Sequence, residues 1–124
     1  METKRPEVIE KILAAIGQPV SFRYPGNEGQ KQGVLKDRAV VESHPGTTGV
    51  PYWDVVDLIE FPDEPQPHWI RIGYYRTPKG RLVWGSQTTI TEPVSVWHRL
   101  LVQAAKDKRW FRDLLEGVVA ELKE

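Results

Sequence analysis

Residues 69–90 read WIRIGYYRTPKGRLVWGSQTTI, two runs rich in β-branched and aromatic residues on either side of Thr77-Pro78-Lys79-Gly80. Proline presets φ at the second position of a tight turn, and glycine accepts the backbone conformation that follows. The stretch therefore predicts an antiparallel hairpin formed by residues 69–76 and 81–90.

The turn also predicts which residues of the two strands face each other. Arg76 is expected opposite Arg81, and Gly73 opposite Trp84, where the missing side chain leaves room for an indole. Because side chains alternate along a strand, one face of the hairpin is the expected core face, with Ile70, Ile72, Tyr74 and Val83. The other face carries Trp69, Arg71, Tyr75, Trp84, Ser86 and Thr88.

The rest of the chain predicts helices at both ends of a β-rich middle. An apolar stripe at helical spacing predicts a helix over residues 6–16, made of Val8, Ile9, Ile12, Leu13 and Ile16. Strands are expected over 20–24, 31–42 (two halves joined at Lys36-Asp37) and 52–61. Residues 91–124 predict two helices with a bend near Asp107, the second with the stripe Phe111, Leu114, Leu115, Val118 and Leu122.

This order of elements predicts an α+β fold in one domain, residues 1–124. The expected sheet is a twisted antiparallel sheet or a small half-open barrel of about five strands. Within the bent second strand, the run Gly33-Val34-Leu35-Lys36-Asp37 is similar to the pattern of Sm-like proteins. The resemblance extends over the first three strands and implies a barrel of the SH3 and Sm-like kind, as a fold analogy only.

Composition excludes several classes of protein. The chain of 124 residues has no cysteine, which excludes a disulfide scaffold, a thiolate zinc site and a thiol nucleophile. No apolar run approaches the roughly 18 residues of a membrane span, and no signal-peptide core follows the first residues. We therefore expect a cytoplasmic protein with no membrane contact.

The formal net charge of zero hides an uneven distribution. Residues 1–67 have a net charge of −4, residues 68–112 of +7 and residues 113–124 of −3. Such asymmetry favours a charged partner, because local potential steers association. The alternative is that the acidic and basic segments neutralise each other within the fold.

The basic segment contains the candidate binding site. The predicted site residues combine rings and cations: Trp69, Arg71, Tyr75, Arg76, Lys79, Arg81 and Trp84 in the hairpin, with Lys108 and Arg109 in a second basic cluster. Rings stack on bases and cations neutralise phosphates. The like-charge pair of Arg76 and Arg81 is unfavourable unless an anion lies between them. The first hypothesis is thus a small binding module for a polyanion such as single-stranded nucleic acid.

Two other interpretations of the same residues stay open. Tyr, Trp and Arg also dominate protein interfaces, so the aromatic surface would equally suit an acidic protein surface or a second copy of the chain in a homodimer. In the structural interpretation, a C-terminal helix covers this face and Trp97 or Trp110 stacks on Trp84.

An enzyme is the third hypothesis. Residues 54–64 contain five carboxylates, which would suit a metal-dependent enzyme, but no lysine follows within the strand and Pro62 ends it. The three histidines match no catalytic motif, and the glycines match no phosphate-binding loop. We predict no catalytic residues, no metal and no cofactor.

Overall fold

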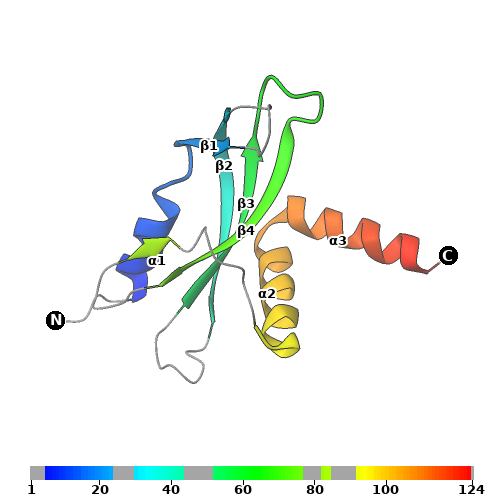
Figure 1. The fold of residues 1–124 in the computed structure, drawn as a ribbon. Helices are drawn as coiled ribbons and strands as arrows, with labels where there is room; N and C mark the ends of the chain where they lie inside the picture. Colours follow the sequence, from blue (N-terminus) through cyan, green and yellow to red (C-terminus); the bar gives the residue numbers. More distant parts are fainter. Residues whose placement is uncertain (1–4, 24–29, 44–51, 77–81, 85–91, 124) are drawn as a thin grey trace.

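The computed structural model describes residues 5–23, 30–43, 52–76, 82–84 and 92–123. The elements in chain order are α1 (Arg5–Leu13), β1 (Pro19–Arg23), β2 (Gln30–Ser43), β3 (Tyr52–Glu60), β4 (His68–Arg76), β5 (Val83–Trp84), α2 (Val94–Asp107) and α3 (Arg109–Leu122). The strands form one antiparallel sheet in sequence order, curled into a half-barrel (Figure 1). The predicted α+β fold, with one N-terminal and two C-terminal helices, is confirmed.

Helices cover both faces of this sheet. Figure 1 shows α1 on one side and α2 on the other. On the first face, Val8 and Ile12 of α1 form a buried cluster with Trp53 and Val55. On the second face, the buried cluster consists of Ala39, Val56, Leu100, Ala104 and Phe111. Residues 53–57 of β3 are all buried, because a central strand covered on both faces has no solvent side.

Helix α1 is shorter than the apolar stripe predicted. It ends at Leu13 rather than at residue 16, and a turn leads to Gly17, whose φ of +91° lies in the left-handed region. The Gly17 N–H donates to the carbonyl of Leu35 at 2.6 Å. Ile12 is fully buried, and Ile16 packs against the cluster that contains Leu35. Residues of the predicted stripe therefore pack into the core both within the helix and after its end.

The predicted joint in the second strand is a β-bulge. Leu35 pairs with Ile59 and Asp37 with Leu58, so Lys36 has no partner in the ladder. The extra residue resets the alternation of side chains. Leu35 and Arg38 therefore share the α1 face although two residues lie between them, and Asp37 lies on the opposite face.

The predicted hairpin is confirmed as an antiparallel pair at Val83–Trp84, whereas residues 85–90 of its second strand lie outside the described residues. Its register is wrong by two residues. Tyr75 pairs with Trp84, and Arg76 pairs with Val83 instead of Arg81, which lies outside the described residues. A shift of two keeps every side chain on its predicted face, and the indole of Trp84 still covers Gly73, where a Cβ would lie 2.9 Å from ring atoms.

The predicted core face of the hairpin is only partly confirmed, because side chains on both faces are half-buried. Ile72 packs on the α2–α3 cluster as predicted, but Ile70 is 40% exposed. On the other face, Tyr75 and Trp84 pack against the α1 cluster. The helix that packs beside Trp84 is therefore α1 and not a C-terminal helix. The apolar stripe of α1 is buried against the same face of the sheet that carries Trp84.

Candidate functional site

A row of three charged side chains crosses the α1 face of the sheet. Arg38 of β2, Asp57 of β3 and Arg71 of β4 are cross-strand partners. Arg38 Nε donates to Asp57 Oδ1 at 2.6 Å, and Arg71 Nη2 donates to Asp57 Oδ2 at 2.9 Å. Asp57 is fully buried and the Arg38 side chain is 1% exposed. One fully buried carboxylate is thus held between a buried guanidinium, that of Arg38, and a partly exposed one, that of Arg71.

The guanidinium of Arg38 also connects α1 to the sheet. Its Nη1 donates to the Ile12 carbonyl and to the Tyr75 hydroxyl, both at 2.9 Å. Burial acts to lower the pKa of Arg38, but the hydrogen bonds and charge of Asp57 outweigh it and raise that pKa. The side chain therefore stays charged and structural, and it occupies the centre of the face where ligand contacts were predicted.

Three of the predicted site residues come together around this row. The Tyr75 and Trp84 rings lie 4.8 Å apart between centroids, and the Arg71 guanidinium lies 4.9 Å from the Trp84 ring. These distances allow cation–π attraction. Arg38 and Asp57, which organise the group, were missed by the sequence analysis. A charged residue within each of the apolar runs 38–41 and 55–59 was the available indication.

The other predicted site residues do not join this group. Trp69 packs edge-on to Phe61 at 5.0 Å between ring centroids, and its Nε1 donates to the Gln66 carbonyl at 2.7 Å. Arg76 is exposed at the end of β4. Lys79 and Arg81 lie outside the described residues.

Lys108 and Arg109 lie at the junction of α2 and α3. Lys108 Nζ donates to Asp37 Oδ1 at 2.9 Å, and Trp110 Nε1 donates to Asp37 Oδ2 at 3.0 Å. Partial burial acts to raise the pKa of Asp37, but these two hydrogen bonds lead a group of effects that lower it overall. Arg109 instead pairs with Asp113 one turn along α3. The second basic cluster thus faces the α2–α3 side and is separate from the hairpin group.

Asp54 is a second buried carboxyl of β3, on the α2 face. Its side chain is 1% exposed, and neither oxygen has a hydrogen-bond partner among the residues that the structure describes. Burial, and after it the charge of Glu92, raises the pKa of Asp54 to about 7, while Arg99 opposes the shift. Across the described ranges, no group of three or more acidic or histidine side chains could hold a metal ion.

The outer part of α3 carries four of the seven exposed large apolar side chains in the described part of the chain. Phe111 at its start is buried in the core, but the stripe continues outward through Leu114, Val118 and Leu122, which are 45%, 46% and 78% exposed. Figure 1 shows α3 extending away from the sheet. This stripe was predicted from the sequence, but the exposure of Leu114, Val118 and Leu122 was not.

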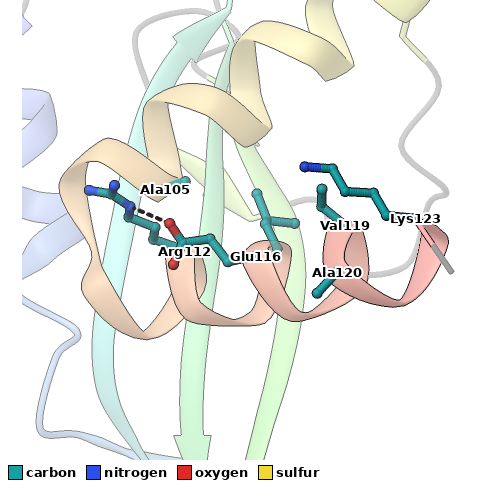
Figure 2. Close-up of a pocket in the computed structure, with 7 residues that line it drawn as sticks. Ala105, Arg112, Glu116, Val119, Ala120 and Lys123 are labelled. Atoms are coloured by element: carbon teal, nitrogen blue, oxygen red, sulfur yellow. Dashed lines mark hydrogen bonds and ion pairs between the residues drawn. The ribbon is translucent and has the colours of Figure 1, made fainter.

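An open groove follows one side of α3, between that helix and the end of α2. Its lining residues are Ala105, Arg112, Leu115, Glu116, Val119, Ala120 and Lys123 (Figure 2). Arg112 Nε donates to Glu116 Oε2 at 3.0 Å along its edge. Val119, in the groove wall, is 47% exposed, so the groove extends the apolar surface of α3 toward α2.

Comparison of the chain with protein-family models, with curated proteins and with solved structures found no significant match. Among the helices described here, none is long and apolar enough to cross a membrane.

Proposed function

We propose that this protein is an interaction module that binds another protein through the outer part of α3. The observation that carries the proposal is the exposed row Leu114, Val118 and Leu122, which continues a stripe whose first residue, Phe111, is buried in the core. Contiguous exposed apolar surface bordered by charged residues is typical of a protein–protein contact.

The charges of α3 favour a protein partner over a lipid surface. Amphipathic helices that lie on membranes carry an excess of Lys and Arg on their polar face. Helix α3 instead has Arg109 and Arg112 balanced by Asp113, Glu116 and Glu121. Its exposed cations Arg109 and Arg112 also form ion pairs with acidic residues one turn away.

Site-specific photo-crosslinking tests this proposal. A photoreactive amino acid at Val118, in the full chain, is expected to capture a protein. The same group at Asp113, an exposed position of the same helix in an ion pair with Arg109, is the matched control and should capture none. Failure to form any protein adduct at Val118 or Leu122 would contradict an interaction through α3.

A second candidate function is contact with a polyanion, the first hypothesis from the sequence. It is supported by the group of Arg71, Tyr75 and Trp84, where rings and a cation do lie together. The exposed Arg76 ends β4 one position beyond Tyr75, the partner of Trp84, on the opposite face, so it adds positive charge near the group and not within it. Asp57 within the group weakens the candidate, because it neutralises part of the positive charge.

Tryptophan fluorescence with single-stranded oligonucleotides at two salt concentrations tests this second candidate. If phosphates bind beside Trp84, Arg76→Gln should reduce the slope of log affinity against log salt by about 1. Lys123→Gln, at the residue that follows α3, should leave that slope unchanged. Absence of quenching at low salt would rule out polyanion binding at this surface.

A further inference from the structure

We infer that α2 and α3 also form one continuous helix, and that the bend at Lys108 hides part of the α3 contact surface until they do. The inference rests on the proposed function, because it specifies how that surface is regulated. Three features support it: the local sequence at the joint, the spacing of apolar residues on both sides of it, and the contacts from the sheet that hold the bend.

The local sequence at the joint contains no signal that ends a helix. Helices commonly end at a glycine or before a proline, and they begin at a residue whose side chain caps the first turn. Residues 94–116 contain neither glycine nor proline, and α3 begins without a side-chain cap. Lys108 alone separates the two helices, with an extended backbone of φ −125° and ψ 118°.

Helical hydrogen bonds reach Lys108 from both sides. Its N–H donates to the Ala104 carbonyl at 2.8 Å, and its carbonyl accepts a hydrogen bond from the Arg112 N–H at 3.0 Å. Both bonds have the four-residue spacing of an α-helix. A change of backbone conformation at this one residue therefore suffices to join the two helices.

The apolar residues keep one helical phase across the joint. Two series of residues, each with an interval of seven, run through both helices. They consist of Trp97, Ala104, Phe111 and Val118, and of Leu101, Lys108, Leu115 and Leu122. Only Lys108 is polar. On a continuous helix the two series form a single stripe with the alternating spacing of an apolar helix face. Two helices at a bend need no common phase, so the pattern favours the continuous helix as a second form of the chain.

Contacts with the sheet hold the bend. Asp37 accepts hydrogen bonds from Lys108 Nζ at 2.9 Å and from Trp110 Nε1 at 3.0 Å. Phe111 is 2% exposed and belongs to the same buried cluster as Leu100. These tertiary contacts override the local preference for a continuous helix, which makes the continuous form a minor state that a partner can select.

Straightening removes Phe111 from that cluster. In a continuous helix, Phe111 lies about 16 Å along the axis from Leu100, too far for both residues to fill one cluster. Helix α2 follows β2 from Glu42 to Asp37, through hydrogen bonds from its first half and from the joint. Its straight continuation passes the exposed Lys36 and the carboxylate paired with it, a polar surface that does not bury an aromatic ring. Phe111 therefore joins the exposed row of α3.

The continuous helix offers a partner more apolar surface than the bent form does. In the bent form, the exposed row consists of Leu114, Val118 and Leu122. After straightening, Phe111 adds an aromatic ring to the row, and aromatic residues are enriched in the cores of protein interfaces. A partner that contacts this ring binds the continuous helix more tightly and shifts the population toward it. The bend is thus an autoinhibitory contact.

Arg109→Pro should lock the bend. Proline suits the first position of a helix, and the residue before a proline prefers the extended backbone that Lys108 already has. In the continuous helix, the same proline removes a backbone hydrogen bond and clashes with the preceding turn. We expect it to lower the population of the continuous helix about a hundredfold. Arg109→Ala is the matched control, because it removes the same exposed cation without restraining the backbone.

Distances between two spin labels, measured by pulsed electron paramagnetic resonance, detect the two forms. Ser95→Cys and Glu121→Cys provide exposed label sites in a chain that has no cysteine. A continuous helix separates these two Cα atoms by about 39 Å, farther than two inclined helices do (Figure 1). The labelled chain without further changes should show mainly the shorter distance.

Removal of both sheet contacts should reveal the continuous helix. In the labelled chain, Asp37→Ala together with Phe111→Ala should add a population at about 39 Å, and Arg109→Pro on this background should remove it. Circular dichroism confirms that each variant is folded. A single short distance in the variant without the contacts, or a broad distribution with no population at the longer distance, would overturn the inference.

Photo-crosslinking at Val118 separates the two proposals. Capture of a partner should be about tenfold weaker or less in Arg109→Pro than in Arg109→Ala. Equal capture in these two variants would overturn the role of the bend and leave the proposed function intact. Absence of capture in every variant, Arg109→Ala included, would overturn the proposed function and the role of the bend together.

Discussion

Asp54 and Asp57 lie three residues apart on the same strand and are equally buried, yet their surroundings are opposite. Asp57 accepts hydrogen bonds from two guanidinium groups on the α1 face. Asp54 lies on the α2 face, near Glu92 and Arg99, and its oxygens have no hydrogen-bond partner in the described part of the chain. The two faces of one sheet thus accommodate a buried carboxyl in two different ways.

The difference depends on whether a cation is hydrogen-bonded to the carboxyl group on each face. A buried carboxylate must be paired, or it takes up a proton. On the α1 face, the bulge in β2 places the Arg38 side chain beside Asp57, and the two form an ion pair. On the α2 face, no cation among the described residues is hydrogen-bonded to Asp54, and burial raises the pKa of Asp54 to about 7. Burial alone therefore does not tell how a carboxyl behaves.

Removing the charge of Asp57 should have the largest effect. Asp57→Asn leaves the buried Arg38 guanidinium without its counter-ion and removes the partner of the partly exposed Arg71. Loss of one partner of a buried ion pair typically destabilises a protein by about 3–5 kcal/mol. Urea denaturation measures the change in free energy of unfolding. Asp113→Asn, in an exposed ion pair, is the control and should change it by less than about 0.5 kcal/mol. A small effect of Asp57→Asn would mean that the buried pairing of Asp57 with Arg38 and Arg71 contributes no more to the free energy of unfolding than an exposed ion pair does.

Asp54→Asn should act in the opposite direction and only at higher pH. The pKa of Asp54 is about 7 in the folded protein and 3.8 as its ordinary value, so between these values the folded state binds more protons than the unfolded state. The contribution of Asp54 to the stability of the wild-type protein therefore falls as the pH rises from about 4 to 7. Asparagine removes this loss, with a ceiling of about 4 kcal/mol at pH 8.

The measurement is the difference in free energy of unfolding between Asp54→Asn and wild type at pH 4.5 and at pH 8. We expect a near-zero difference at the acidic pH and a stabilised variant at the alkaline pH. A destabilised variant at pH 8 would show that Asp54 is paired as a carboxylate, as Asp57 is.

Asp37 is the intermediate case, and its removal should have the smallest effect. It is partly exposed and accepts hydrogen bonds from Lys108 and Trp110, which lower its pKa overall. Asp37→Ala should destabilise the protein by about 1–2 kcal/mol at neutral pH. Because the pKa is lowered, the difference from wild type should shrink as the pH falls below the ordinary carboxyl range. Lys36→Ala, one residue away in a loose pair with Glu60, should have little effect.

The fold was predictable where local pattern determines it. The stripe of Ile12 and its neighbours, the proline-glycine turns and the alternating strands were sufficient for the order of elements. The register of β4 and β5 was not, because residue type at Pro78 does not fix the turn centre to within one residue. The bulge at Lys36 was anticipated only as a joint between strand halves, so its effect on the direction of Arg38 was missed.

The candidate site was less predictable than the fold. The rings Tyr75 and Trp84 do meet Arg71, since the shift in register was even. Periodicity identifies an apolar stripe on α3 but cannot tell whether the fold covers it. Whether Leu122 is buried depends on how far α3 extends past the sheet, and that length is a tertiary property.

The row of Arg38, Asp57 and Arg71 also bears on how the chain avoids misfolding. If β2 slipped by one residue along β3, Arg38 and Asp57 would lie on opposite faces, and two unpaired charges would enter an apolar interior. A slip of two would place Arg38 beside Val55 or Ile59. Apolar residues at positions 38, 57 and 71 would carry no such penalty for a slip of one or of two residues. We therefore expect that replacing all three with apolar residues yields a chain that still collapses but populates several strand alignments, visible as extra sets of backbone amide resonances.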